Sequence, residues 1–154
     1  MGPVDHINIV VRDLAQSERF YSELLGFEVL RRARLEGAWI ESVVGLEGVC
    51  ADVVYVQPPG HGPRIELIQY HRPEGAWSPE LSVANTSGLR HIAFQVTGID
   101  ALYERLTEAG VIFIGPPTDV PGGVIRHDAG RKRLCYFHDP DGVLLELAEY
   151  TPEG

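Results

Sequence analysis

The sequence contains few cysteines and no long apolar run, and each of these absences excludes a class of protein. Its 154 residues include only Cys50 and Cys135, one in each half of the chain. That spacing does not fit a clustered zinc–thiolate site, and we interpret both residues as buried, reduced thiols. No apolar run approaches the roughly 20 residues of a membrane span, so we expect no membrane partner. The N-terminus lacks the basic and then apolar layout of a signal peptide, so a cytoplasmic location is the default expectation.

Positive charge is also scarce. The net charge is −9 and the isoelectric point is near 5.0, whereas a nucleic-acid-binding domain is normally basic. We therefore expect no nucleic-acid partner. One stretch departs from this balance, with Arg126, Arg131, Lys132 and Arg133 within eight residues and His127 among them. The stretch is interpreted either as a solvated loop or as a loop that contacts an anionic substrate.

What the sequence does contain is an internal repeat. Residues 5–11 (DHINIVV) and 90–96 (RHIAFQV) share a His-Ile pair followed by alternating apolar positions, the pattern of a half-buried strand. Residues 64–70 (RIELIQY) and 144–150 (LLELAEY) share an apolar-Glu-Leu-x-x-Tyr pattern. The two histidines are 85 residues apart and the two glutamates 80. Two matches at nearly one offset indicate two copies of one module.

Each copy predicts the element order β-α-β-β-β. Helical periodicity covers residues 14–25 and 99–109, each followed by glycine, and residues 38–44 suggest a short inserted helix. Further strands are predicted at residues 27–35, 50–57, 111–114 and 133–137. The predicted fold is α+β: two repeated βαβββ modules that form a curved mixed sheet around a metal-containing cavity, with the helices outside. In this single domain, module one is 4–71, the linker 72–88 and module two 89–150.

His6, Glu66, His91 and Glu146 occupy matching places in the two copies, and if the modules pack face to face these four side chains converge. Imidazole nitrogens and carboxylate oxygens suit a divalent Ni, Co, Mn, Zn or Fe ion. Both glutamates lie between apolar neighbours, and an inward carboxylate without a partner is costly. A bound metal ion would supply that partner. The alternative is that both glutamates point outward, and alternation does not decide between the two.

These residues resemble the vicinal oxygen chelate superfamily, which includes glyoxalase I, methylmalonyl-CoA epimerase, extradiol dioxygenases and fosfomycin- or bleomycin-resistance proteins. The resemblance covers about residues 4–150. Its signs are His6 with Phe20-Tyr21 and Leu25-Gly26-Phe27, Ile65-Glu66-Leu67, His91-Ile92-Ala93-Phe94, and Asp139-Pro140-Asp141-Gly142 before Glu146-Leu147.

The resemblance implies a metal-dependent lyase or isomerase that acts on a small oxygenated substrate through a metal-stabilised enolate. It places Glu146 as both ligand and proton-transferring base. Glu41 is a candidate partner base, and its alternative is an exposed helix carboxylate. The family also implies a homodimer, in some members with modules exchanged between chains.

Two positions depart from bacterial glyoxalase I, which has Arg where this chain has Val10 and Asn where it has Tyr70. We therefore expect weak activity or none on a glutathione conjugate, although the set of metal ligands is complete. Candidate substrate-binding residues are Tyr70, Arg126, His127, Arg131 and Tyr136. Tyr136 and His127 also match positions of extradiol Fe(II) dioxygenases, an alternative that Glu66 opposes because it would fill a coordination position needed for oxygen. A metal-free drug-binding protein is the third alternative.

Overall fold

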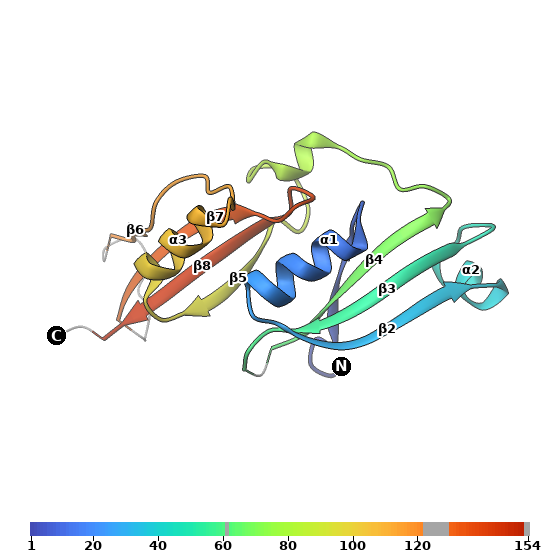
Figure 1. Ribbon diagram of the computed structural model, residues 1–154, viewed down its shortest axis with the longest axis horizontal. Helices are drawn as coiled ribbons and strands as arrows, with labels where there is room; N and C mark the ends of the chain where they lie inside the picture. The colour runs from blue at the N-terminus through green and yellow to red at the C-terminus, as the bar shows by residue number, and fades with distance from the viewer. Residues whose placement is uncertain (61, 122–129, 153–154) are drawn as a thin grey trace. The chain divides into compact units, whose positions relative to one another are not determined.

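The computed structural model describes residues 1–60, 62–121 and 130–152. The chain divides into two compact units, residues 1–77 and 78–154, and each contains a four-stranded mixed sheet (Figure 1). The elements of the first unit are β1 (His6–Val10), α1 (Leu14–Arg19), the π-helix η1 (Phe20–Leu24), β2 (Glu28–Glu36), α2 (Ala38–Val44), β3 (Cys50–Gln57) and β4 (Arg64–Arg72).

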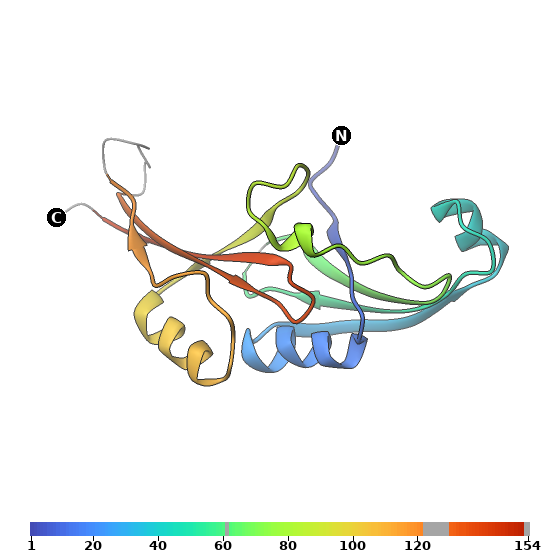
Figure 2. The same ribbon diagram turned by 90° about the horizontal axis from the view of Figure 1, so that it is seen from above.

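The first sheet has the order β1-β4-β3-β2, in which β1 runs parallel to β4 and the other pairs are antiparallel. Asp13 caps α1, since its side chain accepts a hydrogen bond from the Gln16 amide at 3.0 Å. α1 packs against β3 and β4 (Figure 2), and the Leu14 amide donates to Gln69 at 3.0 Å. The helix therefore covers the face that carries Gln69 and Leu67, and strand alternation leaves Glu66 on the opposite face.

The second unit repeats this plan. Its elements are the 3-10 helix η2 (Pro79–Ser82), β5 (His91–Val96), α3 (Ile99–Glu108), β6 (Thr118–Asp119), β7 (Arg131–His138) and β8 (Leu144–Thr151). The sheet order is β5-β8-β7-β6, again with the first pair parallel and the others antiparallel. α3 packs against β8 and buries Ile99 and Leu106 completely.

One predicted strand is wrong. Residues 111–114 form only the isolated bridge between Phe113 and Phe137, although the Ile114 amide still donates to the Tyr136 carbonyl at 2.8 Å. The following Gly115-Pro116-Pro117 interrupts pairing, because proline has no amide hydrogen to donate. The edge position of the sheet is taken further along the chain by β6.

The predicted α+β fold of two repeated βαβββ modules is confirmed, and the inserted helix lies at residues 38–44 as expected. The predicted curved mixed sheet consists of two four-stranded sheets, one in each module. No helix among the described residues is long and apolar enough to cross a membrane.

Candidate metal-ligand pairs

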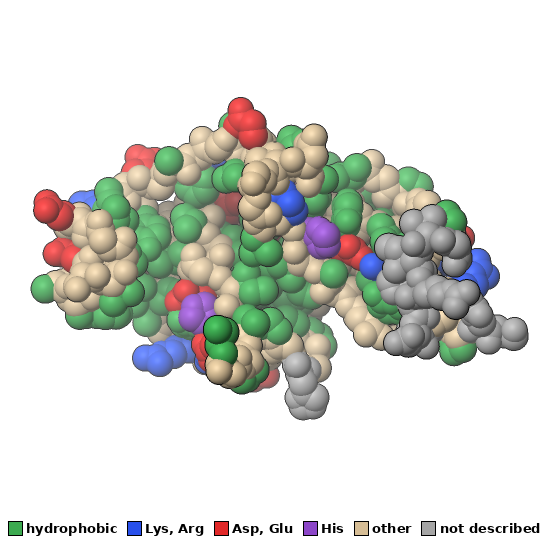
Figure 3. Space-filling model, turned by 180° about the vertical axis from the view of Figure 1, so that it is seen from behind, with side chains coloured by type: hydrophobic (Ala, Val, Ile, Leu, Met, Phe, Trp, Pro, Cys, Tyr) green, Lys and Arg blue, Asp and Glu red, His purple; other side chains and the backbone are tan. Residues whose placement is uncertain are grey.

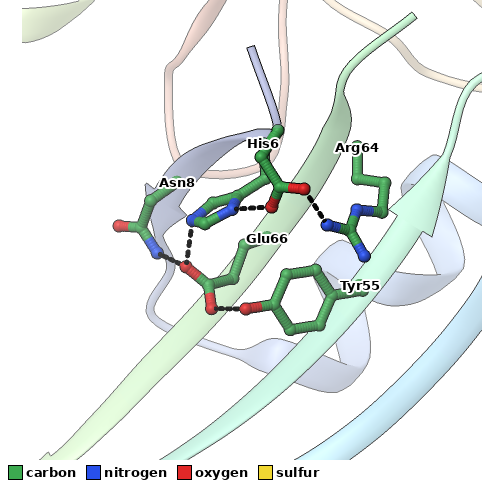
Figure 4. Close-up of polar contacts among 6 residues, drawn as sticks. His6, Asn8, Tyr55, Arg64 and Glu66 are labelled. Atoms are coloured by element: carbon green, nitrogen blue, oxygen red, sulfur yellow. Dashed lines mark hydrogen bonds and ion pairs between the residues drawn. The ribbon is translucent and has the colours of Figure 1, made fainter. Parts of the chain in front are cut away.

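His6 and Glu66 come together because β1 and β4 are neighbours. Asn8 stands opposite Glu66 in the parallel register, so the His6 side chain, two residues earlier, lies on the same face. His6 Nε2 is 3.4 Å from Glu66 Oε2, and Asn8 Nδ2 donates to the same oxygen at 2.8 Å (Figure 4). The Glu66 side chain is only 14% exposed. Its carboxylate is thus held toward the histidine by a neutral donor.

A second contact orients the His6 ring. Its Nδ1 is 2.8 Å from Asp5 Oδ2, and Asp5 in turn pairs with Arg64 (Figure 4). These contacts, with His6 first and Arg64 second, lower the pKa of Asp5. A carboxylate on one ring nitrogen fixes the tautomer and leaves the other nitrogen as an acceptor, which is how metal-binding histidines are commonly held. Nε2 is therefore the nitrogen available to a metal ion.

Tyr55 is a residue that the sequence analysis missed. It lies opposite Glu66 in the β3–β4 register, and its hydroxyl donates to Glu66 Oε1. Burial, followed by the hydrogen bond to Glu66, raises the pKa of Tyr55 to about 12. The repeat could have revealed it, because Tyr136 stands opposite Glu146 in the same way.

The second pair is His91 and Glu146, on β5 and β8. His91 Nε2 is 3.1 Å from Glu146 Oε2, and the glutamate side chain is 3% exposed. The Tyr136 ring lies 5.1 Å from the His91 ring. Burial first, and then the Glu146 charge, raise the pKa of Tyr136. Glu146 is therefore an inward carboxylate, the alternative that its apolar neighbours on both sides had left open.

Lys132 is the cation that faces Glu146, with Nζ 2.8 Å from Oε1. It is the single lysine of the chain and its side chain is 15% exposed. Burial lowers the pKa of Lys132, but the contacts with Glu146 and then with Tyr150 together outweigh burial, so the net shift of this pKa is upward. Alternation along β7 turns Arg131 and Arg133 to the other face, where they pair with Asp119 and Asp100, respectively. The sequence analysis had treated this stretch as a loop.

The other candidate residues have separate surroundings. Tyr70 is half-buried on the Glu66 face, against the cluster of Ala51, Val53 and Ile68. The Glu41 carboxylate accepts a hydrogen bond from the Gly48 amide at 2.9 Å and so closes the turn after α2. Arg126 and His127 lie outside the described residues. The substrate-binding role of these two residues and of Arg131, and the role of Glu41 as a partner base, stay predictions.

Each unit thus brings one of the predicted histidines beside one of the predicted glutamates. Within residues 1–60, 62–121 and 130–152, no three His, Cys, Asp or Glu side chains gather closely enough to hold a metal ion. Two neighbouring ligands bonded to one octahedral ion at about 2.1 Å are about 3.0 Å apart, and the observed separations of 3.4 and 3.1 Å are close to that distance. Figure 3 shows histidine side chains at the surface beside acidic ones. Imidazole nitrogen and carboxylate oxygen, which each pair contains, are donor types that bind divalent ions.

Comparison with known proteins gives one consistent result. The family model described as "Glyoxalase/Bleomycin resistance protein/Dioxygenase superfamily" matches residues 4–147. The uncharacterised protein YaeR of Escherichia coli is 36% identical, with 95% of each chain covered. A 2-epi-5-epi-valiolone epimerase of an Actinomyces species is 28% identical over 94% of this chain and 77% of its own. The crystal structure of a glyoxalase family protein from Bacillus cereus has a TM-score of 0.82 at 29% identity, covering 98% of this chain and 95% of that one.

Proposed function

Because the chain belongs to the Glyoxalase/Bleomycin resistance protein/Dioxygenase superfamily, we propose that its two His–Glu pairs together bind one divalent metal ion and that the protein is a metal-dependent lyase or isomerase. The observation that carries the proposal is the equivalence of the pairs. Each joins the first and last strand of its module, and each directs a histidine Nε2 at a glutamate Oε2, at 3.4 and 3.1 Å. A structural role alone does not require the same pair twice.

A bound divalent ion would act as a Lewis acid toward a substrate carbonyl oxygen. The remaining work falls to side chains of this chain. Glu146 removes a proton from the carbon next to that carbonyl and returns it, which gives isomerisation or, with a leaving group, elimination. Asp5 holds the His6 ring, and Asn8 and Tyr55 hold the Glu66 carboxylate. Such fixed donors reduce the reorganisation needed during proton transfer.

The substrate class is a small oxygenated compound, and the name of the Actinomyces epimerase supports isomerase chemistry at a carbon beside oxygen. A glutathione conjugate is a poor candidate. The exposed Val10 and the half-buried Tyr70 offer neither the guanidinium nor the side-chain amide of the Arg and Asn that bacterial glyoxalase I has at these positions. We therefore expect weak activity or none on the hemithioacetal of methylglyoxal and glutathione.

The four ligands come from two units, so the metal centre forms only where one pair meets the other. That meeting can occur between the modules of one chain or between modules of two copies, and family resemblance favours a homodimer. Light scattering after size-exclusion chromatography measures the assembly. Mixing a His6→Ala chain with a His91→Ala chain then separates the two arrangements, because metal sites are regenerated in mixed dimers only if the pairs come from different copies.

Metal analysis of the purified protein tests the proposal. We expect one divalent ion per chain, and a strong loss of bound metal in His6→Ala and in His91→Ala. His71→Ala is the matched control, since His71 is as exposed as His6 but pairs with Asp52. A metal content that is unchanged in either ligand variant would refute the proposed centre. Absence of metal from the wild type after reconstitution would instead favour a metal-free binding protein.

An extradiol Fe(II) dioxygenase is the second candidate, favoured by the position of the Tyr136 ring 5.1 Å from His91. Oxygen uptake with catechol by anaerobically iron-loaded protein distinguishes it. Uptake that disappears in Tyr136→Phe would support ring cleavage. Exchange of a substrate carbon-bound proton with solvent deuterium, lost in Glu146→Gln, would support the lyase or isomerase.

A further inference from the structure

The surroundings of the two His–Glu pairs differ in one positive charge. In the first unit, the Glu66 carboxylate is held by Asn8 and Tyr55, both neutral donors. In the second unit, Ala93 stands opposite Glu146 where Asn8 stands opposite Glu66. Lys132 supplies the missing contact, at 2.8 Å from Glu146 Oε1.

The position of Lys132 is equivalent to that of Ala51. Each lies four residues before the tyrosine that faces the module's glutamate, and each stands opposite a tyrosine of the last strand, Tyr150 or Tyr70. In the first unit, the 14% exposed Glu66 is thus held without a lysine or arginine, whereas the 3% exposed Glu146 of the second unit has Lys132. Lys132 compensates the more deeply buried carboxylate, and its ammonium group is also available for a second role.

The charges at the proposed metal centre suggest a further role for the Lys132 ammonium group. Two glutamates cancel the charge of a divalent ion, and neutral histidines add none. Lys132 then leaves one positive charge beside the ion, where like charges repel. Arg64 of the first unit does not add to it, because Asp5 neutralises that side chain. An anionic group on the substrate would restore the balance.

We propose that Lys132 binds the carboxylate of a substrate whose neighbouring oxygens approach the metal, which makes the substrate a small 2-hydroxy or 2-oxo acid. The inference rests on the proposed function. An ammonium group has three donors, and Glu146 and Tyr150 are its protein partners here. Its compact charge on a flexible stem can move from the glutamate to an incoming carboxylate without leaving the half-buried site. Every other cationic side chain in this sequence is arginine, which supports a specific use for this lysine.

A pair of probes isolates the charge. Glycolate and hydroxyacetone offer the same hydroxyl and carbonyl oxygens, but only glycolate has an anionic oxygen in place of a methyl group. Titration calorimetry on the nickel-loaded protein compares their affinities for wild type and Lys132→Met. We expect glycolate affinity to fall about tenfold or more, as for loss of a charge-assisted hydrogen bond, and hydroxyacetone affinity to change less than about twofold. Lys132→Arg should keep most of the glycolate affinity.

Arg133→Met is the control, because Arg133 lies on the opposite face and pairs with Asp100. It should leave both affinities unchanged. If Lys132→Met weakens both probes equally, or neither, the lysine does not bind a carboxylate. The rate of Lys132 acetylation in the wild-type protein tests the same point without a variant that could fold poorly. Since Lys132 is the only lysine, its acetylation can be followed by peptide mass spectrometry. Glycolate should slow the acetylation, and hydroxyacetone should not.

Metal analysis of the same samples separates two kinds of failure. If each wild-type chain binds one nickel ion but the affinities for glycolate and hydroxyacetone do not depend on the charge at residue 132, the carboxylate assignment is overturned. The proposed metal centre then remains. No nickel in the wild type would overturn the metal centre and the carboxylate assignment together.

Discussion

Replacing Lys132 with methionine should destabilise the metal-free protein and increase its response to metal. The substitution keeps most of the apolar stem but removes the ammonium that lies 2.8 Å from Glu146 Oε1. Glu146, which is 3% exposed, then loses its only ion-pairing lysine or arginine among the described residues. A buried carboxylate without its cation is a large cost in folding free energy.

The size of the loss can be bounded from the surroundings of the pair. Removing one partner of a fully buried ion pair costs about 3–5 kcal/mol. Lys132 is 15% exposed, so water moderates the loss, and His91 remains 3.1 Å from the other oxygen. We therefore expect about 2–3 kcal/mol. For a chain of this length, that corresponds to a fall in melting temperature of about 5–10 °C.

Calorimetric melting of metal-free and nickel-loaded protein measures both parts of the prediction. Nickel should raise the melting temperature of Lys132→Met more than that of the wild type, because the ion replaces the missing cation and no longer encounters the ammonium. Arg131→Met is the control, since its ion pair with Asp119 is exposed and should contribute less than about 1 kcal/mol. A melting temperature within about 1 °C of the wild type would refute the reasoning.

Three further predictions concern the first unit. Asp5→Asn should weaken metal binding about 10- to 100-fold, because it loosens the carboxylate that orients His6, and metal titration measures this. Tyr55→Phe should lower the free energy of unfolding by about 1.5–3 kcal/mol, the range for a hydrogen bond to a charged group such as Glu66, which urea titration would reveal; an unchanged midpoint would contradict it. The pKa of Asp52 is lowered from 3.8 to about 2, so its stabilisation is present above pH 3.8 and is lost as the pH falls through about 2. The pair is exposed, so the loss should be under about 1 kcal/mol, and it should be absent in Asp52→Asn.

The repeat in the sequence was sufficient to predict the fold of two modules and the strands that carry each histidine and each glutamate, whereas the convergence of all four side chains on one metal ion stays a prediction. Matching His-Ile and Glu-Leu patterns identify the first and last strands of each module, and the structure pairs those strands in parallel in both units. Once the strands are neighbours, strand alternation places each histidine near its glutamate. The inward direction of Glu66 and Glu146 could not be read from alternation, because both have apolar neighbours on either side. It depends on which face the helix covers.

The sequence did not reveal the contacts that depend on cross-strand register. Tyr55 is eleven residues from Glu66 in sequence, and only the hairpin register places it opposite that glutamate. The basic stretch was read as a loop because its charges lie close together. In the structure residues 131–133 begin a strand, and alternation gives Lys132 one face and the two arginines the other. A cluster in sequence is thus divided between two surfaces.

The two modules also serve as controls for each other. A residue present at equivalent positions in both, such as the tyrosine opposite each glutamate, is explained by what the modules share, which is the need to hold an inward carboxylate. A residue present in one only requires a cause that is not shared. Asn8 and Lys132 each contact the glutamate of their own module, Asn8 as a neutral donor and Lys132 as a cation. Replacing one kind of donor with the other is therefore informative. If Ala93→Asn restores the melting temperature of Lys132→Met but not its affinity for glycolate, holding Glu146 and binding the anion are separate functions of one side chain.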